Sequence, residues 1–592
     1  MLDSRVYRAA FVPVVLAIVV GAFALAERPR PIGTTLAPDA FDGRGAFATL
    51  SELARTFPRT RPGSPGDQAL ATRVERDLRA ALEGEVSGSV RVERTTAETV
   101  DGERELTTVI GERPGLNTRR IVIVAHRDRA IENERGRLSG TAALIELARL
   151  YRGRPTRRTL VFVSTSGATG GMAGVRDLVS ELGGPVDAVL VVGDVATRTV
   201  ERPLVIPWSE GGGFAPMRLR RTVERALELE TDLDPGSPRA LAQWARLAVP
   251  LTLTPQGALG GESLSAVTIQ ASGERGPAPD AAVSRAQLQA FGRGTLRSIS
   301  ALDNGPDVPS GPREYVVFRG RILPRWTVTL ITALLLLPAL VASVDGLARV
   351  RRRRQHVAVW LRWLAACAVP FVLTALIARL LGLVGTVPAL PGPVDPLSLP
   401  PETTPVVLVG LVLVLGLLLR APVARALGAR AMPHADEVPG AAAALGVAIT
   451  VLAGLVWAFN PYTALLLVPA VHLWLLAAVP EVRLPRIVLG LMVLAGLLPF
   501  VLVGTYYAGQ FDLGLGALAW QCVLLLAGGT AGPLGALAWS AVLGCGVGAL
   551  LIASRKRRVA DDGPPAGPLG TRGPLSYAGP GSLGGTESAL RR

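Results

Sequence analysis

Residues 119–174 read RRIVIVAHRDRAIENERGRLSGTAALIELARLYRGRPTRRTLVFVSTSGATGGMAG, and this stretch decides the fold. The β-branched run Ile121–Val124 predicts a buried strand that carries His126 and Asp128 at its carboxyl end. A helix is expected next, over residues 139–150 with Ser139 as its cap, then a strand over residues 159–165 and a glycine-rich turn. This order predicts a mixed, mostly parallel α/β sheet with helices on both faces.

The same residues resemble the co-catalytic di-zinc aminopeptidases, which have the zinc-exopeptidase fold. The shared features are a His-x-Asp after a strand, a Ser-Gly before a helix and a glycine-rich strand end, found here at His126, Asp128, Ser139, Gly140, Gly167 and Gly171. The resemblance extends over roughly residues 45–303 and implies a peptidase-like domain.

Most of the zinc site that this resemblance implies is missing from the chain. Gly136 stands where the family has its metal-bridging aspartate, and Ala168 and Thr169 replace the glutamate pair that supplies the general base and a ligand. Asp194 matches a ligand aspartate, but no histidine occurs in residues 271–280, where the distal ligand is expected.

His126 and Asp194 are therefore expected to be vestigial metal ligands, with Asp128 holding the ring of His126. No bound cofactor is expected and no residue is assigned a catalytic role. Two cations need several ligands and a base, so zinc is expected only in the alternative of an active peptidase with non-standard ligands. Glu132 and Glu134 are near enough in sequence to replace the bridging aspartate, but nothing replaces both the base and the distal histidine.

The strand ends should still bring His126, Asp128, Ala168, Thr169 and Asp194 around one concavity, beside Gly136. Such a pocket could be reused for a neutral or anionic group, with help from the amides of the glycine-rich turn. Alternatively the pocket has filled in, and the domain binds through its outer surface.

The second half of the chain has the composition of a membrane protein. Apolar residues make up 49% of the 592 residues, and the net charge of +15 is mostly arginine, which fits basic loops at lipid headgroups. No nucleic-acid-binding motif is present, so nucleic acid is not an expected partner. The cysteines Cys367, Cys522 and Cys545 all lie in apolar runs, which excludes a structural disulfide in the soluble part.

Four parts are expected: a membrane anchor at residues 1–27, an extracytoplasmic domain at 28–321, a multi-span domain at 322–558 and a disordered tail at 559–592. The anchor could instead be a cleaved signal peptide. About eight apolar segments follow, at 326–344, 357–377, 405–419, 441–459, 462–479, 487–506, 513–527 and 533–553.

The basic cluster Arg349–Arg354 places the end of the first span in the cytoplasm and residues 28–321 outside. Eight spans would leave the basic residues 555–558 outside as well, against the same rule. One of the last two segments, around the glycine-rich residues 528–532, is therefore a candidate for a re-entrant segment.

These features predict a multi-pass cell-membrane protein with a degenerate aminopeptidase-like domain, a pseudoenzyme that acts as a non-catalytic peptide- or partner-binding scaffold. Its architecture is similar to the attachment subunit of the GPI transamidase complex. The expected partners are the lipid bilayer, other membrane proteins or a peptide ligand. Two alternatives remain: an active zinc aminopeptidase with non-standard ligands, and a membrane transport or assembly component.

Overall fold

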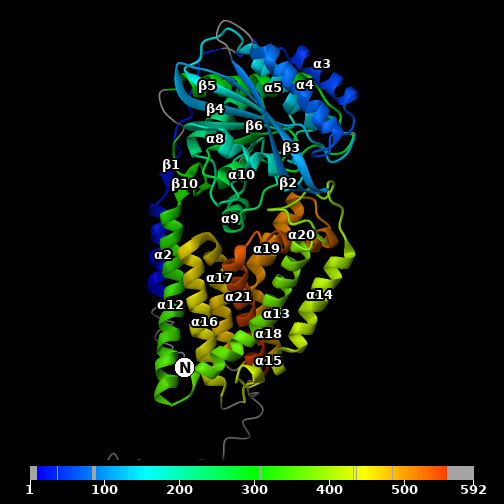
Figure 1. Ribbon diagram of the computed structural model, residues 1–592. Helices are drawn as coiled ribbons and strands as arrows, with labels where there is room; N and C mark the ends of the chain where they lie inside the picture. The colour runs from blue at the N-terminus through cyan, green and yellow to red at the C-terminus, as the bar shows by residue number, and fades with distance from the viewer. Residues whose placement is uncertain are drawn as a thin grey trace, which may run out of the picture.

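The computed structural model describes residues 10–36, 38–82, 88–132, 134–236, 238–305, 310–430, 432–434, 437–482 and 484–555. An α/β half lies above a bundle of apolar helices (Figure 1). The predicted disordered tail at 559–592 and the first nine residues of the predicted anchor lie outside the described residues.

The α/β half is built on a seven-stranded sheet of order β2-β3-β5-β4-β6-β8-β7. The strands are β2 (Ser89–Thr99), β3 (Gly102–Arg113), β4 (Asn117–His126), β5 (Arg158–Thr165), β6 (Val186–Val192), β7 (Val205–Ile206) and β8 (Ala266–Ile269). The four central strands β5, β4, β6 and β8 are parallel, and β3 and β7 join this core antiparallel. The expected mixed sheet is therefore confirmed, with its parallel part at the centre.

Helices cover both faces of this sheet because alternate residues of each central strand point to opposite sides. Ile121 and Ile123 of β4 pack into the larger cluster, with α3 (Gly43–Thr56), α4 (Pro65–Leu82), α5 (Ser139–Leu150), α8 (Met217–Thr231) and α11 (Arg285–Asn304). Val122 and Val124 pack into the opposite cluster, with α6 (Ala173–Arg176), α7 (Leu178–Glu181) and α10 (Gln256–Gly261).

A small sheet connects the N-terminal segment to the start of the helical half. Its strands, in the order β1-β10-β9, are β1 (Ala26–Glu27), β10 (Arg321–Pro324) and β9 (Tyr315–Phe318). The apolar helix α2 (Phe11–Phe23) precedes β1 and packs beside α12 (Arg325–Arg352), which follows β10 (Figure 1).

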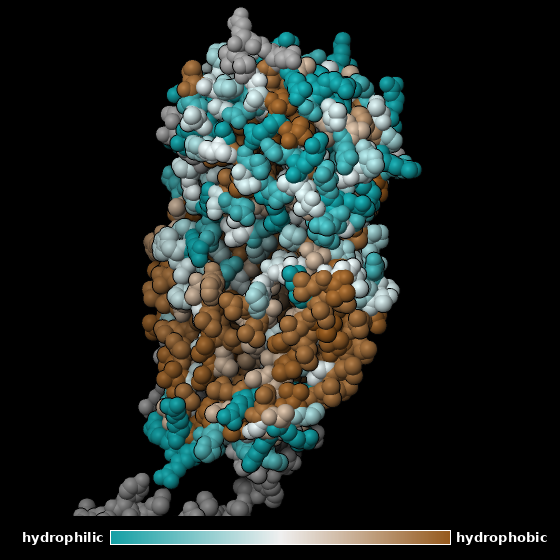
Figure 2. Space-filling model, viewed as in Figure 1, coloured by the Kyte–Doolittle hydropathy of each residue, from teal (hydrophilic) through white to brown (hydrophobic). Residues whose placement is uncertain are grey.

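Every apolar segment expected in the second half forms helix. After α12 come α13 (Val357–Leu383), α14 (Thr403–Leu418), α15 (Arg420–Ala426), α16 (Val438–Phe459), α17 (Pro461–Ala478), α18 (Arg486–Gly496), α19 (Leu498–Gln510), α20 (Leu515–Gly528) and α21 (Gly532–Arg555). Apolar side chains form a broad band over these helices, with hydrophilic side chains at both ends (Figure 2).

Within the described residues, five helices are long and apolar enough to cross a membrane, and up to seven spans result if each of two bent pairs counts as one. The bent pairs are α14 with α15, at 55°, and α18 with α19, at 48°. Pro499, in the first turn of α19, explains the second bend. The remaining segment is the 14-residue helix α20, about 21 Å long against the ~30 Å hydrocarbon core.

Candidate functional site

The carboxyl ends of two parallel strands carry the residues expected as vestigial zinc ligands. His126 is the last residue of β4, and Asp194 lies two residues beyond β6. Val124 of β4 pairs with Val191 of the parallel strand β6, so the side chains of His126 and Asp194 reach the same edge of the sheet. His126, Ala168 and Asp194 line one pocket. The structure thus brings together three of the residues that the sequence placed around one concavity.

Asp128 holds the glycine-rich turn, and not the histidine ring as expected. Its carboxylate accepts hydrogen bonds from the backbone N–H groups of Ala168 at 3.1 Å and Thr169 at 2.8 Å. In the described residues, Nδ1 of His126 has no hydrogen-bond partner. Because Asp128 already occupies the turn amides of Ala168 and Thr169, they cannot also serve the anion site suggested from the sequence.

Ser139 supports the strand end of β6 and does not cap α5, which corrects the expectation from the sequence. Helix α5 begins at Ser139 itself, after Leu138. The Ser139 hydroxyl lies 2.5 Å from the carbonyl oxygen of Gly136 and 3.2 Å from Oδ1 of Asp194, and it accepts the N–H of Val195 at 2.9 Å. The contacts of Ser139 with Asp194 and Val195 join residues more than fifty positions apart, which a local capping pattern cannot reveal.

Gly136 packs so closely against Thr197 and Asp194 that a side chain has no room there. A Cβ atom at Gly136 would lie 2.6 Å from Oγ1 of Thr197 and 3.0 Å from Oδ1 of Asp194. That oxygen of Asp194 already accepts the backbone N–H groups of Ala196 and Thr197. The space of the lost carboxylate is therefore closed by neighbouring atoms.

Arg137 brings a buried positive charge to the same pocket. Its Nε donates to Glu134 at 3.0 Å, and its Nη2 donates to Asp395, from the helical half, at 2.6 Å. Burial alone would lower the pKa of Arg137, but the carboxylates of Glu134 and Asp395 outweigh burial and raise it. Arg137 therefore stays charged in the pocket that His126 also lines.

The two glutamates considered as substitute ligands are committed elsewhere. Glu132 pairs with Arg59 at the surface. Glu134 is buried, and besides Arg137 it accepts the backbone N–H groups of Ala130 and Ile131. Glu134 is thus already satisfied by these donors, and Glu132 does not line the pocket.

Glu274 also lines the pocket and was not singled out from the sequence. Glu274 lies in residues 271–280, the segment in which a histidine ligand was expected. A search of that segment for acidic residues as well would have found it. Its carboxylate forms a buried ion pair with Arg246, whose Nη1 donates to Oε1 at 2.8 Å. Like Glu132 and Glu134, it is paired with an arginine.

The pocket itself is nearly full. The free volume within it is about 10 Å³, roughly the minimum for one ordered water molecule. His126 is 6% exposed, and burial lowers its pKa, with Arg137 acting in the same direction against Asp128. The imidazole is thus neutral at neutral pH. Of the two expectations, reuse or filling, the structure favours filling.

The residues at this edge do not fit a two-zinc centre. In the parts of the chain that the structure describes, no group of three or more His, Cys, Asp or Glu side chains could hold a metal ion. The buried polar atoms left without a partner include Nδ1 of His126, Oδ2 of Asp194 and Oγ1 of Thr197. One imidazole and one carboxylate beside a guanidinium cannot hold two cations about 3.5–4 Å apart.

The loop between α13 and α14, residues 384–402, covers the glycine-rich turn. Val394 pairs with Gly170 in an antiparallel bridge, and the side chain of Arg176 donates to the carbonyl oxygen of Pro391 at 3.0 Å. This loop also carries Asp395, the partner of Arg137. The helical half therefore closes the pocket of the α/β half.

No family model matches the chain. No curated protein matches it either. Among solved structures it is similar to a glutaminyl cyclase from an Acidobacteriales bacterium, with 15% identity over 46% of this chain and 99% of that one and a TM-score of 0.35. A Zn-dependent exopeptidase from Parabacteroides distasonis has 15% identity, 44% and 98% coverage and a TM-score of 0.34. The LapA aminopeptidase of Legionella pneumophila has 13% identity, 46% and 73% coverage and a TM-score of 0.36.

Proposed function

We propose that this chain is a membrane-anchored, aminopeptidase-like protein whose zinc site has been dismantled. Its α/β half acts as a non-catalytic scaffold that binds a peptide or a protein partner, and its apolar helices hold it in the membrane. The resemblance of residues 119–174 to the di-zinc aminopeptidases supports the ancestry. The five to seven potential spans support the anchoring.

The observation that carries the proposal is the buried arrangement of Glu134, Arg137 and Asp395. An arginine with two carboxylates fills the edge of the sheet at which a peptidase needs metal ligands and space for a substrate. Gly136, Ala168 and Thr169 supply no carboxylate there. Binding is consequently assigned to the outer surface of the α/β half.

Residues 28–321 are placed outside the cytoplasm in this proposal. The basic cluster 349–354 supports this placement. The end of α21 supports it as well, because Nη2 of Arg555 contacts Sδ of Met432, which follows the basic helix α15 with Arg420 and Arg425. If α20 does not cross the membrane, these basic segments share one side. The conflict with the positive-inside rule then disappears.

Hydrolysis of an aminoacyl arylamide by purified full-length protein in zinc-containing buffer tests the proposal. The expected rate equals that of His126→Ala, measured in parallel. A rate well above background that falls on His126→Ala would instead establish the alternative, an active metallopeptidase. The unpartnered atoms of His126 and Asp194 are the feature that favours this alternative.

A further inference from the structure

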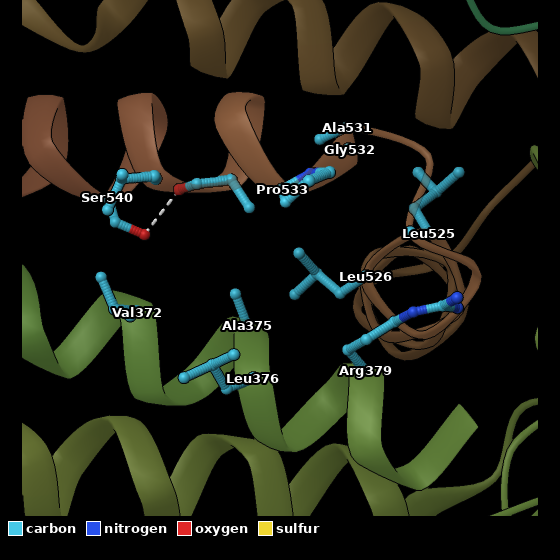
Figure 3. Close-up of a pocket in the computed structure, with 13 residues that line it drawn as sticks. Val372, Ala375, Leu376, Arg379, Leu525, Leu526, Ala531, Gly532, Pro533 and Ser540 are labelled. Carbon is cyan, nitrogen blue, oxygen red and sulfur yellow. Dashed lines mark hydrogen bonds between the residues drawn. The ribbon is translucent and has the colours of Figure 1, made fainter. Parts of the chain in front are cut away.

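A large apolar pocket lies in the helical half, and it shares none of its lining residues with the pocket at the edge of the sheet. Its volume is about 510 Å³, within the roughly 300–1,000 Å³ that small-molecule sites occupy. Helices α13 and α21 run side by side along it, and α20 is seen nearly end-on between their ends (Figure 3). The lining is apolar on all three helices and includes Ala375 and Leu376 of α13, Leu526 of α20, and Ala536 and Leu537 of α21.

The pocket opens on the outer surface of the helical bundle. Leu376 and Leu537, which lie on its two long sides, are 58% and 56% exposed. Both belong to helices that form the apolar band of Figure 2. The opening therefore faces the hydrocarbon of a bilayer, from which an acyl chain can enter without crossing water.

Arg379 is the charged residue in the lining, at the end of the pocket beside α20 (Figure 3). Its Nη1 donates to the carbonyl oxygen of Ala527 at 2.5 Å. No carboxylate pairs with it among the described residues, so its positive charge is not neutralised there. A guanidinium has five N–H donors, and only one of them is used in this contact.

The depth of Arg379 matches a lipid headgroup. It lies four residues before the end of α13 at Leu383, and the positive N-terminal end of the α21 dipole begins nearby at Gly532. Val372, at the other end of the pocket, is seven residues earlier on α13. Those two helical turns descend about 10 Å into the ~15 Å of one leaflet.

We propose that this pocket binds an anionic phospholipid, with its phosphate on Arg379 and an acyl chain between α13 and α21. Ser540, at the deep end, donates its hydroxyl hydrogen to the carbonyl oxygen of Ala536 and leaves no free donor for a second polar group. One cation at the headgroup level above an apolar groove is complementary to one negatively charged amphiphile. This inference does not depend on the state of the zinc site.

Native mass spectrometry of the delipidated full-length protein, titrated with phosphatidylglycerol or phosphatidylcholine of equal chain length, tests the proposal. Both lipids carry a phosphate, but the choline ammonium of phosphatidylcholine cancels its net charge and competes with Arg379 for the phosphate, so the expected preference for phosphatidylglycerol is roughly tenfold. Arg379→Gln should remove the preference, and Ala536→Phe should weaken the binding of both lipids because the larger side chain fills the groove. Arg425→Gln, at an exposed arginine of α15, is the matched control and should bind like the wild type.

Three results would overturn the proposal. They are an unchanged lipid preference in Arg379→Gln, no loss of binding in Ala536→Phe, and competition by inorganic phosphate as strong as that by phosphatidylglycerol. Either of the first two results would indicate that lipid binds only to the outer surface of the helices. The third would indicate that the ligand is a free anion. Because Arg379 also binds the end of α20, Arg379→Lys is the second variant, and it should keep part of the preference while retaining the charge.

Discussion

The side chain of Arg137 places a buried positive charge in the pocket at the edge of the sheet. Its guanidinium is buried between Glu134 and Asp395, and it lines the pocket that also holds His126 and Asp194. This guanidinium has a charge of the same sign as a metal ion. Glu134 and Asp395 stabilise this guanidinium and not a metal ion.

Removing that guanidinium should destabilise the protein strongly. Arg137→Ala leaves the buried carboxylates of Glu134 and Asp395 without their cation, and breaking such a pair costs about 3–5 kcal/mol. Thermal unfolding of the full-length protein in detergent measures the loss. Arg135→Ala, at the exposed neighbour, should change the stability by less than about 0.5 kcal/mol. Equal midpoints for the two variants would contradict the buried ion pair.

Asp187 predicts how the stability depends on pH. Its carboxylate lies 2.5 Å from Nη2 of Arg119 and 2.7 Å from Nε of Arg158. Burial alone would raise its pKa, but the hydrogen bonds from both arginines outweigh burial and hold the pKa below its usual range. Since the folded pKa is lower than the unfolded one, the stabilisation is present above the unfolded pKa. It is lost as the pH falls through the folded value.

Asp187→Asn should therefore be less stable than the wild type at pH 7, by about 1–3 kcal/mol. The difference should shrink between about pH 5 and pH 2. Unfolding midpoints measured across this range test the prediction, with Glu103→Gln at an exposed position as the control. A difference that stays constant with pH would show that the carboxylate charge of Asp187 does not contribute.

Among the elements, α20 departs most from what hydropathy predicts. Its apolar composition resembles that of the other segments, but it has 14 residues and lies across the ends of α13 and α21. The side chain of Gln521 holds it to the loop 384–402 through both backbone groups of Val394. Hydropathy predicts that such a helix exists, whereas its direction depends on contacts with residues more than a hundred positions away in the sequence.

Two glycines of α20 provide a matched test of that packing. A Cβ atom at Gly528 would lie 2.0 Å from the carbonyl oxygen of Leu390, whereas one at Gly516 would have no atom within 4 Å. Gly528→Ala should therefore destabilise the protein by about 1–3 kcal/mol. Gly516→Ala should be neutral or stabilising by up to about 1 kcal/mol, since alanine favours helix. Thermal unfolding compares the two variants, and similar midpoints would argue against the contact with Leu390.

The strands were the part most accessible from the sequence. The strand predicted over residues 159–165 is β5 (Arg158–Thr165), one residue longer at its start, because a short apolar run fits a strand buried on both faces. The site was harder to predict. The edge on which His126 and Asp194 meet follows from parallel strand order, but Asp395 lies 258 residues from Arg137 and its role required the fold.

At the scale of the whole molecule, the helical half contacts the α/β half at two places. One is the pocket that Arg137 and Asp395 close, and the other is α9 (Ala240–Ala248). Asn460 donates to the carbonyl oxygen of Leu247, and Thr463 to that of Ala248. Arg246 of α9 packs against the rings of Tyr506 and Tyr507. Contacts at two separate places oppose hinge motion between the halves.

The proposed sidedness predicts a labelling pattern in intact cells. Gln68→Cys, exposed on α4, should react with a membrane-impermeant maleimide, and Arg353→Cys, exposed after α12, should react only after permeabilisation. Both are made with Cys522→Ser, because Cys522 is the exposed native cysteine among those that the structure describes. The reverse pattern would place the α/β half in the cytoplasm.

The zinc content of the full-length protein tests the central claim most directly. After incubation with excess zinc and removal of free metal, elemental analysis should give well under one zinc per chain. The value should be unchanged in a variant with both His126→Ala and Asp194→Asn. One or two zinc ions per chain in the wild type, lost in that variant, would contradict the dismantled site.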